Sequence, residues 1–215
     1  AIDLPFIWAL ILAIGVMMYV LLDGFDLGVG MFTAIAQSEE ERNMMTAPVE
    51  PVWDGNETWL IIGGGGLFAA FPTAYAIIMP AFYLPVLIML AALIFRGVAF
   101  EFRHKAVRRP TRIFWNGAFY GRSFTAAFSQ GIMLGGMVQG IHVEGGAFAG
   151  GAFDWLTPFT LLTGISVVIG YMLLGACWLV LKTEGELHDK ARKWGRMALA
   201  GVAICFLAVS FATLS

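Results

Sequence analysis

Long apolar segments constrain this chain more than any other feature of its sequence. Each holds about 20 predominantly apolar residues, the length that an α-helix needs to cross the ~30 Å hydrocarbon core of a bilayer. Hydrophobic residues make up 59% of the 215-residue chain and charged residues only 13%, whereas soluble domains carry about 25% charged residues. We therefore expect an all-α, polytopic transmembrane helix bundle that forms a single domain over residues 1–215. About six spans are predicted, at residues 5–36, 57–78, 81–99, 114–140, 156–181 and 194–214.

Two prolines make the boundary between the second and third spans the hardest to place. Pro80 predicts a tight break between these spans. Pro72 is the alternative position for a kink, because proline disrupts a helix interior.

Outside the predicted spans, lysine and arginine occur on one side only. The loops at 37–56, 100–113 and 182–193 hold them, whereas the 79–80 turn, the 141–155 loop and the N-terminus hold none. Positively charged loops usually stay in the cytoplasm, so we expect the N-terminus on the periplasmic side. The basic residues sit in short loops rather than on one folded face, so nothing indicates nucleic-acid binding.

Two pairs of acidic residues lie toward the cytoplasmic side of the first two spans. Asp23 and Asp26 stand in the first apolar segment, and Asp54 and Glu57 stand where the second begins. Members of each pair are three residues apart, so on a helix they share one face. A charge inside the bilayer costs about 2.5–3.5 kcal/mol on insertion scales and commonly marks an ion or proton pathway. The four acids are therefore candidates for a proton path that starts in the cytoplasm.

Three further charged residues are candidate partners for these acids. Arg96 and Glu101 lie at the cytoplasmic end of the third span, and Arg122 lies inside the fourth. The same residues allow a second interpretation, in which buried ion pairs and helix caps neutralise the acids and serve only the structure. The sequence leaves both interpretations open.

The histidines and cysteines give no sign of a haem or metal site in this chain. His104, His142 and His188 all fall in predicted loops, although intramembrane haem iron is commonly held by His, Met or Cys. The methionines are typical packing residues of apolar helices. Cys177 and Cys205 are expected to be buried packing residues, because they lack the clustering of a disulfide or metal site. We therefore expect no cofactor bound by this chain itself.

Five ordered motifs run from the first span to the segment before the sixth. They read DGFDLGVG at 23–30, WDGNExWL at 53–60, GxLFAAFPxxYA at 65–76, FRGVAFEFR at 95–103 and GELH at 185–188. Together they resemble subunit II of the cytochrome bd-type quinol oxidases, including the cyanide-insensitive branch. Subunit II of this family is normally longer by two or three spans, so we expect this chain to correspond to its N-terminal part.

The resemblance implies a subunit of a bacterial inner-membrane terminal oxidase, which oxidises quinol and reduces O₂ to water. Haem b and haem d would belong to the larger subunit I, and subunit II would pack against it as a pseudo-symmetric partner without haem. A structural quinone and a small accessory subunit are compatible with this pattern. For the acids, the resemblance implies that Asp54 is the entrance of a cytoplasmic proton path. It implies a structural or proton-linked role for Asp23 and Asp26.

Two other functions fit the same acids. A proton-coupled secondary transporter would place them at a substrate site, and inverted internal repeats would be its signature; we find none in the sequence. A purely structural scaffold subunit would have every acid ion-paired.

Overall fold

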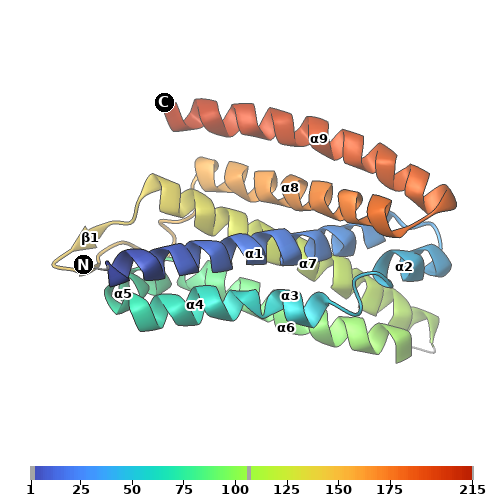
Figure 1. Ribbon diagram of the computed structural model, residues 1–215, viewed down its shortest axis with the longest axis horizontal. Helices are drawn as coiled ribbons and strands as arrows, with labels where there is room; N and C mark the ends of the chain where they lie inside the picture. The colour runs from blue at the N-terminus through green and yellow to red at the C-terminus, as the bar shows by residue number, and fades with distance from the viewer. Residues whose placement is uncertain (1–2, 106–107, 215) are drawn as a thin grey trace.

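The structure is a computed structural model that describes residues 3–105 and 108–214, without the side chains of residues 100–101, 103–105 and 109. Its α-helices are α1 (Leu4–Phe32), α2 (Glu39–Thr46), α3 (Trp53–Glu57), α4 (Trp59–Ala70), α5 (Pro72–Ala81), α6 (Tyr83–Lys105), α7 (Arg109–Gln139), α8 (Pro158–Lys182) and α9 (Gly185–Leu214) (Figure 1). A 3-10 turn, η1 (Thr33–Ile35), follows α1. The antiparallel strands β1 (Val143–Glu144) and β2 (Ala147–Phe148) form a hairpin between α7 and α8.

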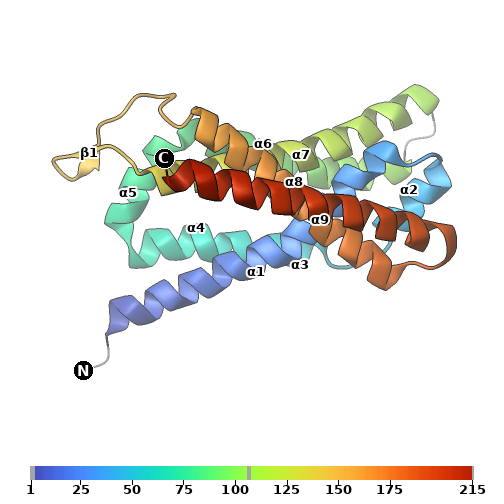
Figure 2. The same ribbon diagram turned by 90° about the horizontal axis from the view of Figure 1, so that it is seen from above.

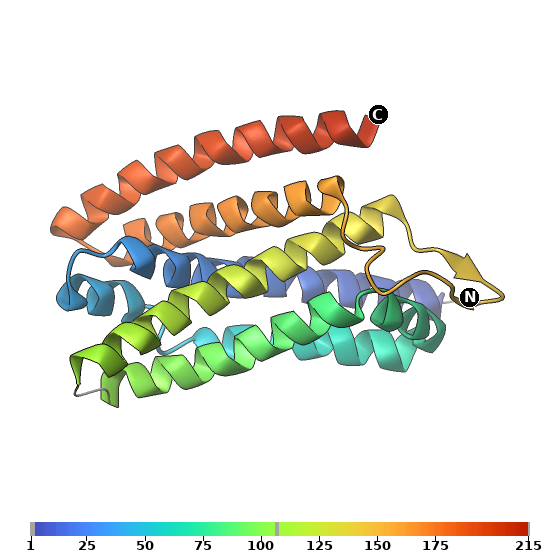
Figure 3. The ribbon, with the colours of Figure 1, turned by 180° about the vertical axis from the view of Figure 1, so that it is seen from behind.

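The long helices lie side by side and form a bundle. α1 contacts α4, α7 and α8, while α6 packs along α7 and α7 packs along α8. α9 packs on α8 and forms the outermost layer, at the top of Figure 1. Seen from behind in Figure 3, α6 and α7 run next to each other along most of the bundle. The all-α bundle that the sequence predicts is confirmed.

The apolar core lies where the long helices meet. One cluster joins α1, α6, α7 and α8 through residues such as Leu27, Leu93, Ala127 and Val168. A second cluster, which includes Met45 of α2, joins the C-terminal part of α1 to α8 and to the start of α9.

Three helices, α1, α8 and α9, are long and apolar enough to cross a membrane. α5 and α6 also meet this criterion when they are taken together, as one span bent by 86°. By length and composition, the described residues therefore contain three candidate spans, or four with this bent pair. These helices support a multi-pass membrane protein. The count of six spans and the side of the N-terminus stay predictions.

The second predicted span, residues 57–78, is not one helix. α4 ends before Phe71 and α5 begins at Pro72, because the residue before a proline disfavours helical backbone angles while proline fits the first helical position. The next break falls at Phe82 rather than at Pro80, which lies inside α5. Figure 2 shows that α5 runs across the end of the bundle and connects α4 to α6.

Three predicted loops contain helices instead, because α6 and α7 include residues 100–105 and 109–113 of the loop predicted at 100–113. The 37–56 segment holds α2 and most of α3, and the motif at 185–188 forms the first turn of α9. Gly185 adopts a positive φ of 65°, a conformation that glycine tolerates without strain, at the reversal between α8 and α9. His188 Nδ1 lies 3.0 Å from the carbonyl oxygen of Val180. His188 is therefore a helical residue that closes the C-terminal end of α8.

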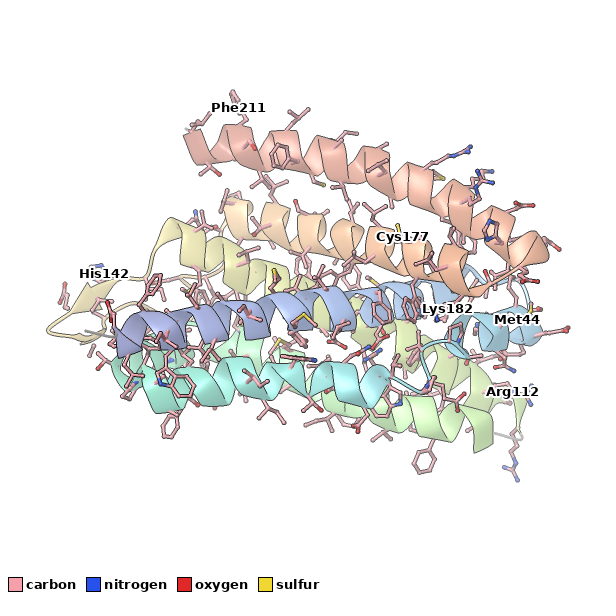
Figure 4. The ribbon with its side chains drawn as sticks, viewed as in Figure 1. Met44, Arg112, His142, Cys177, Lys182 and Phe211 are labelled. Carbon is pink, nitrogen blue, oxygen red and sulfur yellow. The ribbon has the colours of Figure 1, made fainter. Side chains whose placement is uncertain are left out.

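Basic residues gather at one end of the bundle. Arg112 and Lys182 lie toward this end in Figure 4, together with Met44 of α2, while His142 lies at the opposite end near the N-terminus. The turns at the opposite end contain no lysine or arginine. The charge asymmetry of the sequence thus corresponds to two different ends of one bundle.

Two glycines let α1 and α8 approach each other backbone to backbone. A Cβ added to Gly175 would lie 2.5 Å from the carbonyl carbon of Gly28 and 2.6 Å from the amide nitrogen of Val29. A Cβ added to Gly28 would overlap the carbonyl oxygen of Tyr171. Small residues at such crossings allow close packing of helices in membranes.

We predict that Gly175→Ala destabilises the protein by about 1–3 kcal/mol, the usual cost of overpacking. The matched variant Gly170→Ala on the same helix should be tolerated, because no neighbouring atom lies within 4 Å of a Cβ there. Thermal unfolding in detergent, followed by tryptophan fluorescence, checks this. Equal melting temperatures for the two variants would contradict the close crossing.

The segment between α1 and α3 is fastened to the bundle by charged side chains. Arg42 Nε donates to the carbonyl oxygen of Thr33 at 3.0 Å, and Lys190 Nζ of α9 lies 3.0 Å from Glu41 Oε1. Burial alone would raise the pKa of the Glu41 carboxyl, but the amide of Gln37 and the Lys190 ammonium outweigh it and hold the pKa below its usual value. α2 therefore ties α1 to α9.

This lowered pKa predicts a pH-dependent contribution to stability. A carboxyl whose pKa is lower in the folded protein stabilises it above the unfolded pKa, near 4.5, and loses this effect as the pH falls through the folded pKa. Glu41→Gln should therefore lower the melting temperature at neutral pH and have little effect well below pH 4.5. The exposed neighbour variant Glu40→Gln serves as the control. If Glu41→Gln lowered the melting temperature equally in acid, the charge of Glu41 would not be the cause of the destabilisation.

Candidate functional site

Two aspartates and one arginine form a charged cluster inside the bundle. Asp23 and Asp26 of α1 are 0% exposed, and Arg96 of α6 is 1% exposed. Arg96 Nη1 lies 3.5 Å from Asp23 Oδ1, and the guanidinium lies over the ring of Phe119 from α7, 5.8 Å from its centre. Removing charges from water costs several kcal/mol per ion, so each charge in this cluster depends on the others. Arg96 is placed as a charge partner of the first acidic pair.

Asn56 brings α3 to the same cluster. Its Nδ2 donates to Asp26 Oδ2 at 2.8 Å and approaches the carbonyl oxygen of Leu22 at 3.5 Å. Both contacts are to α1, and Asn56 is itself buried. The amide therefore fixes the short helix α3 against the acidic turn of α1.

Several polar atoms of the cluster have no hydrogen-bond partner closer than 3.5 Å among the described residues, although the Tyr19 hydroxyl lies close enough to Asp23 to interact with its carboxylate. These atoms are both carboxylate oxygens of Asp23, Oδ1 of Asp26 and the three guanidinium nitrogens of Arg96. Buried polar atoms are nearly always satisfied by protein groups or by ordered water. The cluster therefore has the chemistry to bind water molecules around the Asp23–Arg96 pair.

The second acidic pair lies between this cluster and the surface. Asp54, in the first turn of α3, is exposed, while Glu57 at its end is half-buried. The carboxylate of Glu57 interacts electrostatically with Asp23 and Arg96 as well as with Asp54. The four acids thus form a series that begins at an exposed carboxylate and ends at fully buried ones.

Arg122 is not part of this cluster. Its guanidinium lies over the ring of Phe95, 4.6 Å from the ring centre, and its Nη1 approaches the Phe95 carbonyl oxygen at 3.4 Å. It therefore points to the outer side of α6 and α7 rather than toward Asp23. The side chain of Glu101, the third predicted charge partner, lies outside the described residues.

A chain of three polar side chains, which sequence reasoning missed, extends from the cluster. Tyr171 of α8 donates its hydroxyl to Gln130 Oε1 at 2.6 Å, and Gln130 Nε2 of α7 donates to the hydroxyl of Tyr19 at 2.8 Å. Tyr19 lies one helical turn before Asp23 on α1, and both tyrosines interact electrostatically with that aspartate. The four-residue spacing from Tyr19 to Asp23 could have indicated that the two side chains share a helix face. The sequence held no comparable sign that Gln130 of α7 and Tyr171 of α8 would join them.

The described side chains include no group of three or more His, Cys, Asp or Glu that could hold a metal ion. His142 is exposed beside Glu144, and His104 lies outside the described side chains. Cys205 is buried, but Cys177 is exposed on α8 and both are free thiols. The expectation of burial was therefore wrong for Cys177, because α8 presents that residue to the outside of the bundle.

Fold and site together define an all-α membrane protein with a buried carboxylate–arginine cluster next to an exposed carboxylate. The family model of cytochrome bd terminal oxidase subunit II matches residues 4–215, and the chain belongs to this family. The resemblance inferred from the sequence motifs is confirmed.

Named relatives agree with this assignment. Subunit 2 of cytochrome bd-I ubiquinol oxidase from Escherichia coli (strain K12) is 35% identical over 209 residues, which cover 94% of this chain and 55% of the relative. The probable cytochrome oxidase subunit 2 of Haemophilus influenzae is 33% identical, and the match covers 95% of this chain and 56% of that relative. Cytochrome bd ubiquinol oxidase subunit 2 of Bacillus subtilis is 34% identical, and the match covers 99% of this chain and 62% of that relative. The chain therefore spans little more than half the length of these relatives.

Arg96→Met should leave the Asp23 carboxylate buried without its counter-charge, which costs about 3–5 kcal/mol when one partner of a buried pair is removed. The double variant Asp23→Asn/Arg96→Met should regain much of this stability, because it removes both charges. Unfolding titrations in detergent micelles of the two single variants and the double variant measure the coupling. Additive losses would show that the pair does not interact.

Proposed function

We propose that this chain is the non-haem subunit of a bacterial quinol:O₂ oxidoreductase, a terminal oxidase of aerobic respiration. Membership in the cytochrome bd terminal oxidase subunit II family carries this proposal, and relatives named as ubiquinol oxidase subunits support it. A haem-bearing subunit I would bind haem b and haem d, oxidise quinol and reduce O₂ to water. This chain would support subunit I and bind no haem. The activity would belong to the complex, with a small accessory subunit and a structural quinone as compatible additions.

For the topology, we propose six crossings of the inner membrane with the N-terminus on the periplasmic side. The collection of basic residues at one end of the bundle supports this orientation. α4 has 12 residues and reaches about 18 Å at ~1.5 Å per residue. The second crossing would therefore need α3 as well as α4, with α5 lying near the periplasmic surface.

The acids would form a proton path from the cytoplasm. Asp54 would take up a proton at the surface, and Glu57 would pass it toward Asp23 and Asp26. The gradation from exposed to buried carboxylates supports this order. The unsatisfied polar atoms around Arg96 also support it, because water molecules bound there would complete a hydrogen-bonded chain. Acid chains inside membrane proteins commonly serve this purpose.

A scaffold role is the second candidate, and the Asp23–Arg96 contact favours it. In this case the ion pair would only orient α1 against α6. The two roles differ at Asp54, which lies on the surface of α3 and contributes nothing to that pair.

We predict that Asp54→Asn lowers oxygen consumption of the purified complex by roughly tenfold or more, because a positioned proton donor contributes at least this much. The visible haem spectrum should be unchanged, because Asp54 is exposed and away from the core. Glu50→Gln, which removes an exposed carboxylate four residues earlier in the same segment, is the matched control. Unchanged turnover in an intact Asp54→Asn complex would favour the scaffold role.

A further inference from the structure

Arg122 is a charged residue that neither the fold nor the proposed proton path uses. It belongs to α7, and its guanidinium stacks on Phe95 on the outer side of α6. Phe95 precedes Arg96, and consecutive helical residues point about 100° apart, so Arg122 lies at the same level as the buried cluster but on a different side of α6. Starting from Arg109, Arg122 is about 20 Å along a helix that rises 1.5 Å per residue.

Arg122 has no ion-pair partner among the described side chains. A guanidinium has five N–H donors, and among the described residues Arg122 makes one hydrogen-bond approach, from Nη1 to the Phe95 carbonyl oxygen at 3.4 Å. Arginines within membrane spans are rare and almost always pair with another group or face a water-filled cavity. The charge of Arg122 therefore calls for an acceptor that comes from outside the described chain.

The surroundings of Arg122 have the shape and composition of a helix-docking surface. Gly117 and Gly121 stand four residues apart on the same side of α7, and a Cβ added to Gly121 would meet no neighbouring atom within 4 Å. A shallow groove beside Arg122 includes both glycines together with Phe114 and Tyr120. Small residues at this spacing admit another helix closely, and aromatic residues with arginine are enriched at protein interfaces.

We propose that this face of α7, defined by Phe114, Gly117, Gly121 and Arg122, docks a transmembrane helix of the haem-bearing subunit, and that a carboxylate on that helix pairs with Arg122. The choice of partner rests on the proposed function, whereas the need for an acidic side chain follows from the charge of Arg122. Bidentate hydrogen bonding to a carboxylate suits a planar guanidinium at a buried interface. The pair would join the two subunits at the level of the Asp23–Arg96 cluster.

The first test uses the whole complex, affinity-purified through this chain in mild detergent. Arg122→Glu should reduce the haem absorbance recovered per mole of chain by about tenfold or more, because it places like charges together in a desolvated contact. Arg122→Lys should retain most of it. The control Arg196→Glu makes the same charge change at an exposed position of α9 and should retain normal haem. Full haem recovery with Arg122→Glu would overturn the proposal.

A second test keeps the native charge and therefore does not depend on a destabilised variant. A photoreactive amino acid replaces Phe114, which is 61% exposed, and in a control it replaces Ile204 of α9, which is 68% exposed. The expected product at position 114 is a covalent adduct with the haem-bearing chain. An adduct at position 114 with a phospholipid or with a second copy of this chain would contradict the docking site. A native complex without any haem-bearing chain would instead contradict the proposed function, whatever position 114 captures.

Discussion

The pairing of Asp23 with Arg96 inside an apolar bundle is the interaction on which the rest of the structure depends. Neither charge can be buried alone without a cost of several kcal/mol, so α1 and α6 must meet at this level. Asn56 adds α3 through its bond to Asp26. The Tyr19–Gln130–Tyr171 chain adds α7 and α8. Polar contacts thus set the register of five helices whose apolar surfaces alone would allow many arrangements.

The same cluster links structure to the proposed function. Its unsatisfied guanidinium and carboxylate atoms lie at the inner end of a series of acids that starts at the exposed Asp54. Buried polar atoms that no protein group satisfies are usually hydrogen-bonded to ordered water. Water bound around Arg96 would satisfy them and would connect Glu57 to the buried aspartates. Hydration of this cluster is therefore the central claim, and the proton path depends on it.

Hydropathy predicted most of the fold, but it did not predict what each helix faces. The span predicted at 156–181 matches α8, Pro158–Lys182, within two residues, because the polar ends of that segment are sharp. The 57–78 segment is not one helix, because the chain breaks at Phe71 and Pro72, the alternative kink position that the sequence offered. The contact of Asp23 with Arg96 followed from their predicted common level. The outward direction of Arg122 did not follow, because its rotation depends on the packing of α7 against α6.

The most direct measurement is a high-resolution electron cryo-microscopy map of the whole complex that resolves ordered water. We expect water molecules hydrogen-bonded to the Arg96 guanidinium and to Asp23, continuing past Glu57 toward Asp54. A cluster without ordered water would contradict this claim. In that case Arg96 would hydrogen-bond directly to Asp23, and apolar side chains would fill the space between Glu57 and the aspartates.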